Sequence, residues 1–210
     1  MVMGESKEEK YLERLTRAFL SLDAEKHVNT KEFNEAVDAI LPVFDYLGTV
    51  FSFAKGEMNT KRESLVKVQS KLPTLTEVVE QDKKTNTVTK KNSCARNLHR
   101  LLSAVSFVAN LLQNLAKGPA VTLHQAASDA YDATLAPVHT YFVRMAVKTS
   151  MYLLPDRATF IASIGETEAT AKEHGAKFVP AVEELLVKVL ALYEGTQMPS
   201  SDVRFLPSSS

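Results

Sequence analysis

The chain has 210 residues, with 25 Lys and Arg against 25 Asp and Glu, so its formal net charge at pH 7 is zero. This balance excludes the broad basic field that draws proteins to nucleic acid or to acidic membranes, so any anion site must be a local cluster. Cys94 is the single cysteine, which excludes an internal disulfide. The length, with 45% hydrophobic residues, favours one large domain over two small ones.

The sequence predicts neither a leader peptide nor a membrane span. Residues 1–10 are polar and charged, unlike the apolar centre of a signal peptide. No stretch approaches the roughly 18 uninterrupted apolar residues of a transmembrane helix. We therefore expect a protein of the reducing cytosol.

Apolar residues recur at helical spacing along the chain, without strand alternation, so the expected fold class is all-α. Pro42 should kink the second helix. The helices are expected at about residues 12–22, 30–47, 51–72, 75–79, 93–117, from 122, 137–153, a short stretch after 155, and 176–193.

Local signals mark several helix boundaries. Asn29 and Glu32 have the spacing of a capping box, in which each side chain bonds the other residue's backbone. Residues 81–92 are polar and rich in threonine and lysine, which predicts a solvated loop. Pro180 is expected near the first turn of the last helix, where proline is tolerated. We expect residues 1–28 to form a helix and linker within the same domain as residues 29–194, and residues 195–210 to form a flexible tail.

Catalytic and metal-binding motifs are missing. The seven glycines are isolated, so the chain has no Walker loop, GxGxxG or GxSxG. The five histidines form no HExxH, and none has a glutamate three residues before it. We therefore expect no enzyme, no cofactor and no metal site. A helical hydrolase would need a nucleophile and a base that the sequence does not offer, and binding is the favoured class of function.

The helix over residues 93–117 is apolar in most directions but carries Arg96 and Arg100 on one face near its start. Arginine suits the phosphate of an amphiphile, because its planar fork donates paired hydrogen bonds. The alternative is that both arginines reach solvent or pair with acidic residues of a neighbouring helix, as long basic side chains commonly do. At helical spacing, the same face continues through Ser103, Phe107 and Leu111.

The remaining candidate residues can be explained by ion pairing or packing, without a ligand. Glu57 and Lys61 are spaced for an i,i+4 ion pair on an exposed helix. His139 stands before an apolar run that begins at Tyr141, where a histidine is most often a satisfied, partly buried side chain.

Three segments resemble the glycolipid transfer protein superfamily, in the order and spacing of that family. They are FDYLGTVFSFAKGEMNTK (44–61), CARNLHRLLSAVSFV (94–108) and APVHTYFVRMAVKTSMYLLPDR (136–157), within a looser match over about residues 30–193. The second segment resembles the plant accelerated-cell-death and ceramide-1-phosphate transfer type. The resemblance implies a two-layer sandwich of about eight helices around an apolar slot. It also implies transfer of a phosphorylated sphingolipid of the ceramide-1-phosphate type between membranes.

The resemblance also implies roles for individual residues. Glu57 falls where the family has an aspartate that accepts hydrogen bonds from the sphingoid amide and hydroxyl. Lys61, Arg96 and Arg100 fall on the cationic phosphate site. His139 falls on the histidine that contacts the amide carbonyl. Glycolipid-selective members place a tryptophan at the position of Arg100, and this chain has no tryptophan.

Three positions depart from the family pattern. Glu57 is one methylene longer than aspartate, Ser103 replaces a residue that is usually basic, and Tyr141 replaces a tryptophan used at the membrane interface. Tyr141 is therefore a candidate for membrane contact, with packing in the core as its alternative. The candidate lining of the slot comprises Ser103, Phe107, Leu111 and Phe142.

The expected partners are a sphingolipid ligand and, transiently, a membrane surface, with no nucleic acid and a monomeric protein. An alternative function on the same fold is a lipid sensor or interaction module that does not transfer its ligand. The departures at Glu57 and Ser103 keep this alternative open.

Overall fold

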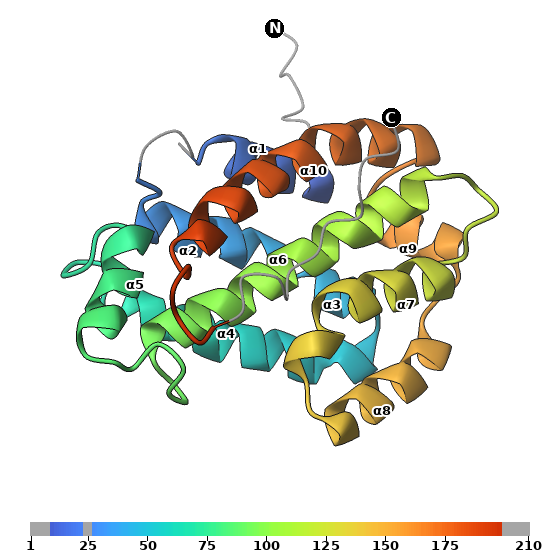
Figure 1. The fold of residues 1–210 in the computed structure, drawn as a ribbon. Coiled ribbons are helices and arrows are strands. Elements are labelled where there is room, and N and C mark those ends of the chain that lie inside the picture. Colours follow the sequence, from blue (N-terminus) through green and yellow to red (C-terminus); the bar gives the residue numbers. More distant parts are fainter. Residues whose placement is uncertain (1–8, 23–26, 199–210) are drawn as a thin grey trace, which may run out of the picture.

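The structure is a computed structural model that describes residues 9–22 and 27–198 (Figure 1). Within these ranges the chain is helical, and its one strand-like feature is an isolated bridge between Asn29 and Thr74, so the all-α fold class is confirmed. The helices are α1 (Tyr11–Leu20), α2 (Thr30–Ile40), α3 (Val43–Tyr46), α4 (Ser52–Val66), α5 (Leu75–Lys84), α6 (Cys94–Ala116), α7 (Leu123–Thr134), α8 (Tyr141–Ser150), α9 (Arg157–Ser163) and α10 (Glu168–Ala191), with 3-10 turns η1 (Thr49–Phe51), η2 (Ala136–Val138) and η3 (Met151–Leu153).

The long helices form two layers, as expected. Helices α10, α6 and α7 lie side by side in one layer, and α1, α2 and α4 form the other (Figure 1). Helix α6 is central, because it contacts α10 and α7 within its own layer and α2 and α4 across the sandwich. It buries eighteen of its 23 residues, which explains why its apolar side chains point in most directions.

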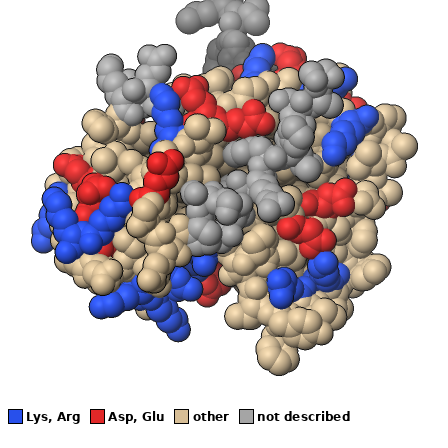
Figure 2. All heavy atoms as spheres, viewed as in Figure 1, with Lys and Arg blue, Asp and Glu red and all other residues tan. Residues whose placement is uncertain are grey.

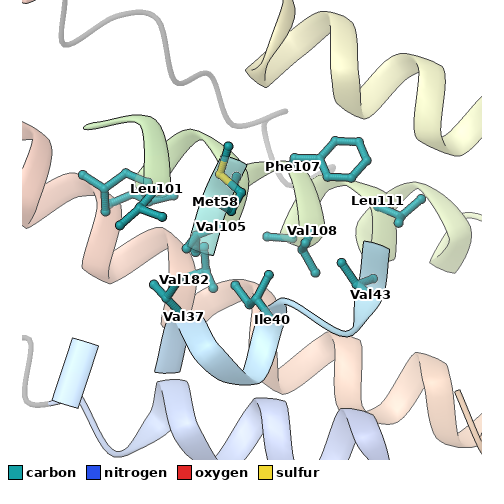
Figure 3. Close-up of a cluster of buried hydrophobic side chains, with 14 of the residues drawn as sticks. Val37, Ile40, Val43, Met58, Leu101, Val105, Phe107, Val108, Leu111 and Val182 are labelled. Carbon is teal, nitrogen blue, oxygen red and sulfur yellow. The ribbon is translucent and has the colours of Figure 1, made fainter. Parts of the chain in front are cut away.

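Apolar side chains fill the space between the layers. Val105 and Val108 of α6 face Val37 and Ile40 of α2 there, and Leu111 of α6 faces Val43 of α3 (Figure 3). None of these six side chains is more than 2% exposed. Burial of this kind contributes about 1.5–3 kcal/mol per large aliphatic side chain, so the interlayer core is a main source of stability.

Helix starts follow the predicted capping chemistry with one correction. The Asn29 side chain accepts from the backbone N–H groups of Lys31 and Glu32, but the described contacts include no return bond from the Glu32 carboxylate. The reciprocal box occurs instead at Thr74 and Glu77, which open α5. The predicted capping box at Asn29 was therefore half right.

The last helix begins eight residues earlier than predicted. Thr167 caps α10 at Glu168, so Pro180 lies inside the helix and not near its first turn. Gly175, just before the predicted start, has a low helix propensity. In the folded protein, Gly175 lies against α6, where an added Cβ would be 3.8 Å from the Leu112 Cβ. Contact between the two helices thus outweighs the low helix propensity of glycine.

Other boundaries shift by smaller amounts. Pro42 separates α2 from the short α3, so the expected kink is a break. The helix expected over residues 51–72 ends at Val66, and the loop expected from residue 81 begins after Lys84. The helix expected over 137–153 is divided into η2, α8 and η3, because Thr140 caps a new helix.

No helix described in residues 9–22 and 27–198 has the length and apolarity to cross a bilayer. Most of the predicted tail (195–210) and parts of the predicted segment 1–28 lie outside the described residues, so the division of the chain at 28/29 and 194/195 remains a prediction.

Candidate headgroup site at the start of α6

The first turn of α6 is fixed by side chains from three sources. The Ser93 hydroxyl accepts from the Arg96 N–H at 3.2 Å, which caps the helix. Asp82 of α5 accepts from the Ala95 N–H at 2.7 Å, and the Tyr193 hydroxyl, just after α10, donates to the Ala95 carbonyl at 2.6 Å. The start of α6 is thus held by groups that lie far from it in the sequence.

Helix α4 is bonded to the same end of α6. The Asn97 amide donates to the Ser64 hydroxyl at 2.9 Å, and the Cys94 thiol lies 3.8 Å from the Ser64 carbonyl oxygen. Lys61 comes one turn before Ser64 on α4. The contacts at Ser64 therefore bring Lys61 to the end of α6 that carries the arginines.

Glu57 and Lys61 form the ion pair that their spacing predicts, with 2.5 Å between the Glu57 Oε2 and the Lys61 Nζ. The hydrogen bond and charge of Lys61 lower the pKa of Glu57, with smaller effects from Lys91 and His139. The Glu57 side chain is 67% exposed and that of Lys61 is 20% exposed. The pair is thus more than an isolated surface bridge, because it lies within the electrostatic range of residues from two other segments.

His139 is half-buried and bonded to Tyr131, whose hydroxyl lies 3.0 Å from its Nδ1. Burial raises the pKa of Tyr131 to about 12, so the phenol keeps its proton and remains a hydrogen-bond partner of Nδ1. Burial lowers the pKa of His139, as do the charges of Arg100 and Lys61, whereas Glu57 raises it. The neutral form of the imidazole is therefore favoured at pH 7.

Arg96 and Arg100 are both half-buried on α6. The Nη1 of Arg100 lies 3.1 Å from the Nδ1 of His99. Arg96 makes no ion pair with any carboxylate in residues 9–22 and 27–198, so the described contacts do not show the acidic partner that was its alternative explanation. The structure brings Arg100, Lys61 and His139 within electrostatic range of each other, and Arg96 lies one helical turn away on the same face of α6.

Ser103, Phe107 and Leu111 follow along α6 and are all buried. The Ser103 hydroxyl donates to the His99 carbonyl of its own helix at 3.1 Å and is 0% exposed. Phe107 stacks against Phe44 with ring centroids 6.5 Å apart. A hydrocarbon chain could enter this region only by separating such contacts, so any slot here must open by movement of side chains or helices.

Helix α8 presents apolar side chains to solvent. Phe142 is 82% exposed and does not line the interlayer space, contrary to our expectation, because α8 buries only Val147. Tyr141 is 63% exposed, which excludes the alternative that it packs in the core. In Figure 2, Lys and Arg gather over α4, α5 and the following loop, whereas the surface over α8 is mainly uncharged.

The sequence did not reveal several residues that hold this site. His99, Tyr131, Ser64 and Asp82 each bond a site residue or its helix, but each belongs to a residue type that is common in any helical protein. Their partners lie on other elements or are reached only by a particular side-chain direction. The spacing of apolar residues in the sequence indicates neither. Lys91 was assigned to a solvated loop, although its charge acts on Glu57.

Comparison with known proteins adds independent evidence. The family model described as glycolipid transfer protein (GLTP) matches residues 28–166, which is more than half of the chain. The chain belongs to the glycolipid transfer protein family. The matched segment includes α4, α6 and α8, and so contains every residue of the candidate site.

Individual relatives support the same membership in the glycolipid transfer protein family. The chain is 29% identical to Accelerated cell death 11 of Arabidopsis thaliana over 202 residues, which cover 93% of this chain and 98% of that protein. It is 26% identical to Glycolipid transfer protein 1 of the same organism, over 78% of this chain and 88% of the relative.

Solved structures show the same fold. The crystal structure of an aspartate-to-alanine variant of Arabidopsis Accelerated cell death 11, complexed with C12 ceramide-1-phosphate, superposes with a TM-score of 0.86 at 28% identity. This match covers 91% of the present chain and 99% of that chain. Human ceramide-1-phosphate transfer protein, at 20% identity, has a TM-score of 0.79 and covers 88% of this chain and 95% of its own, which supports the fold alone.

Proposed function

We propose that this protein binds a phosphorylated sphingolipid of the ceramide-1-phosphate type and carries it between membranes. One observation carries the proposal: Arg100, Lys61, His139 and Glu57 lie within electrostatic range of one another at the start of a helix whose next turns are buried and mainly apolar. Such a site matches a ligand with an anionic head, an amide and long hydrocarbon chains. The likeness to Accelerated cell death 11, crystallised in variant form with C12 ceramide-1-phosphate, supports the same ligand class.

Each group has a role that its protonation state permits. Lys61, Arg96 and Arg100 donate charge-assisted hydrogen bonds to the phosphate oxygens. Neutral His139 donates its Nε2–H to the amide carbonyl, in the tautomer in which Nδ1 accepts from the Tyr131 hydroxyl. The Glu57 carboxylate accepts from the amide N–H and the sphingoid hydroxyl once Lys61 turns from it to the phosphate.

Transfer follows from the energetics of burial. Each methylene removed from water contributes about 0.8 kcal/mol, so a long-chain sphingolipid almost never leaves a bilayer unaided. A protein that buries the same chains between its helical layers lowers this barrier without an external energy source. The lipid then moves down its own gradient of activity. We infer that the protein is not an enzyme and uses no cofactor, since carriage makes and breaks no covalent bond.

The membrane surface is the second partner. Tyr141 and Phe142 project from α8, whose N-cap residue Thr140 directly follows His139 at the headgroup site. Amphipathic aromatic residues favour the level of the lipid headgroups, so insertion of this helix would hold the site at the bilayer. We propose that this contact is transient and peripheral, and that the protein acts as a cytosolic monomer whose lipid-binding domain comprises residues 29–194.

A vesicle competition assay tests the ligand class. Donor vesicles contain equal amounts of ceramide-1-phosphate and a diacylglycerol phosphate, and transfer of each to acceptor vesicles is measured. We expect preference for ceramide-1-phosphate, and loss of that preference in Glu57→Ala, because only the sphingoid lipid offers an amide and hydroxyl to the carboxylate. A wild-type preference for the diacylglycerol lipid would mean that Glu57 does not recognise a sphingoid amide.

The second candidate is a lipid sensor that binds without efficient transfer. It is favoured by Ser103, whose buried hydroxyl is committed to the His99 carbonyl and adds nothing to the phosphate site. The same vesicles distinguish the two functions. A sensor would bind ceramide-1-phosphate on donor vesicles at equilibrium yet deliver almost none to acceptors, whereas a carrier would do both.

A further inference from the structure

His99 is a fully buried histidine next to Arg100 on α6. Its ring packs edge-on against Tyr193, with ring centroids 5.3 Å apart and an interplanar angle of 82°. Tyr193 is itself only 1% exposed and donates to the Ala95 carbonyl. The imidazole is thus held between the start of α6 and the segment after α10.

The contact between Arg100 and His99 fixes the proton of the imidazole. A guanidinium has five N–H donors and no acceptor, so the Arg100 Nη1 must donate to the His99 Nδ1, 3.1 Å away. His99 is therefore neutral, and its proton is on Nε2. A protonated ring could not accept this bond and would repel the guanidinium.

This bond gives the Arg100 guanidinium a direction. An arginine side chain has many rotamers, and a planar fork binds phosphate well only when its plane and edge are set. The Arg100 charge acts on the pKa of both His139 and Tyr193, for which burial is the main cause of the shift, so the guanidinium lies within electrostatic range of both groups. The N–H that bonds the buried His99 limits the rotation of the fork and so orients its remaining donors.

We propose that His99 is a positioning residue for phosphate recognition: as a neutral acceptor it orients Arg100 toward the phosphate of the lipid. The inference rests on the proposed function for the identity of the ligand, although the hydrogen bond itself does not depend on it. His99 touches no part of the proposed ligand, and its contribution passes entirely through Arg100.

Two substitutions separate positioning from packing. His99→Leu keeps most of the volume but removes the acceptor, whereas His99→Asn places an amide oxygen where Nδ1 accepts. Binding of ceramide-1-phosphate and of uncharged ceramide is measured for both variants. We expect His99→Leu to weaken ceramide-1-phosphate about two- to tenfold, as for loss of one ordinary hydrogen bond, and to leave ceramide unchanged. His99→Asn should restore most of the loss. Equal weakening of both lipids, or no rescue, would overturn the proposal.

A double-mutant cycle assigns the effect to Arg100. If His99 acts only through Arg100, then His99→Leu has no further effect on ceramide-1-phosphate binding once Arg100→Ala is present. Additive losses would show that His99 contributes by another route and would contradict the proposal.

A measurement without lipid distinguishes this inference from the proposed function. Nitrogen-15 NMR of the full-length protein reports the imidazole tautomer of His99. We expect a neutral ring with the proton on Nε2 and a clear change of the Nδ1 resonance in Arg100→Ala. A proton on Nδ1 would exclude the bond whatever the ligand proves to be. Conversely, the protein could give the expected spectrum and yet not bind ceramide-1-phosphate. The hydrogen bond would then stand, and only the proposed ligand would be wrong.

Discussion

Helices α6 and α8 both contribute to the proposed site, but they differ in how the rest of the protein holds them. Helix α6 buries eighteen of its 23 residues, and groups from α4, α5 and the segment after α10 bond its first turns. Helix α8 buries only Val147 of its ten residues and exposes its aromatic side chains. Recognition of a headgroup thus requires donors in fixed positions, whereas contact with a bilayer requires apolar side chains that do not pack in the core.

The largest expected effect is at the start of α6, which the rest of the protein holds in place. Arg100→Ala should reduce ceramide-1-phosphate transfer about 10- to 100-fold, because a charge-assisted hydrogen bond contributes about 1.5–3 kcal/mol. Transfer between vesicles measures it, and Arg14→Ala, an exposed arginine on α1, is the matched control. Unchanged transfer in both Arg100→Ala and Arg96→Ala would place the phosphate elsewhere.

Substitutions in α8 should have a different kinetic signature. Phe142→Ala should slow transfer by about tenfold, since partial insertion of a phenylalanine into the bilayer contributes on the order of 1.5 kcal/mol. Tyr141→Ala should have a smaller effect of the same kind. Equilibrium binding of a short-chain, water-soluble ligand should stay the same. Val187, 69% exposed on α10, supplies the control Val187→Ala. Equal losses in transfer and in binding would mean that α8 shapes the ligand site itself.

Acidification should destabilise the headgroup end. Burial and the charges of Arg100 and Lys61 lower the pKa of His139 from its usual 6.5, so below pH 6.5 the unfolded chain binds a proton that the folded protein resists. Stability therefore falls as the pH drops from 6.5 toward the folded pKa. Urea unfolding at pH 7.5 and 5.5 should show a smaller pH dependence in His139→Gln than in wild type, and an equal dependence in the two proteins would contradict the prediction. A bound phosphate would raise the pKa of His139 and reduce the effect.

The smallest expected effect concerns the pair Glu57 and Lys61. Glu57→Gln should change the free energy of unfolding by less than about 0.5 kcal/mol, because exposed i,i+4 pairs contribute little. Lys31 and Glu35 form a similar exposed pair on α2, so Glu35→Gln is the matched control. A loss well above 1 kcal/mol would show that α4 depends on this pair for its position.

Much of the fold followed from local patterns. The spacing of apolar residues located α6 within one residue at each end, and the glycine-proline pair after it marked its end. The predicted start of α10 was wrong: Thr167 and Thr170 form a capping box that opens the helix at Glu168, and the helix continues through Gly175, which packs against Leu112 of α6. The cap is a local signal that the prediction did not use, whereas the contact at Gly175 depends on tertiary packing.

The site shows the same division. The helical spacing of Arg96 and Arg100 and the pair Glu57–Lys61 were visible in the sequence, and the family resemblance supplied their expected roles. The hydrogen bonds between Tyr131 and His139 and between Arg100 and His99 were not visible in the sequence, because they depend on where the side chains point. Phe142 was predicted to line the slot, whereas on α8 it is exposed to solvent.

The hydrogen bond from Tyr193 to the Ala95 carbonyl joins residues 98 positions apart. During synthesis on the ribosome, α6 leaves the exit tunnel long before this partner does. We expect nascent chains stalled before residue 193 to lack affinity for ceramide-1-phosphate vesicles. Chains in which residue 193 has left the exit tunnel should bind them, and co-pelleting with the vesicles measures the difference. A newborn chain would then extract lipid from a membrane only once its last helix has been delivered.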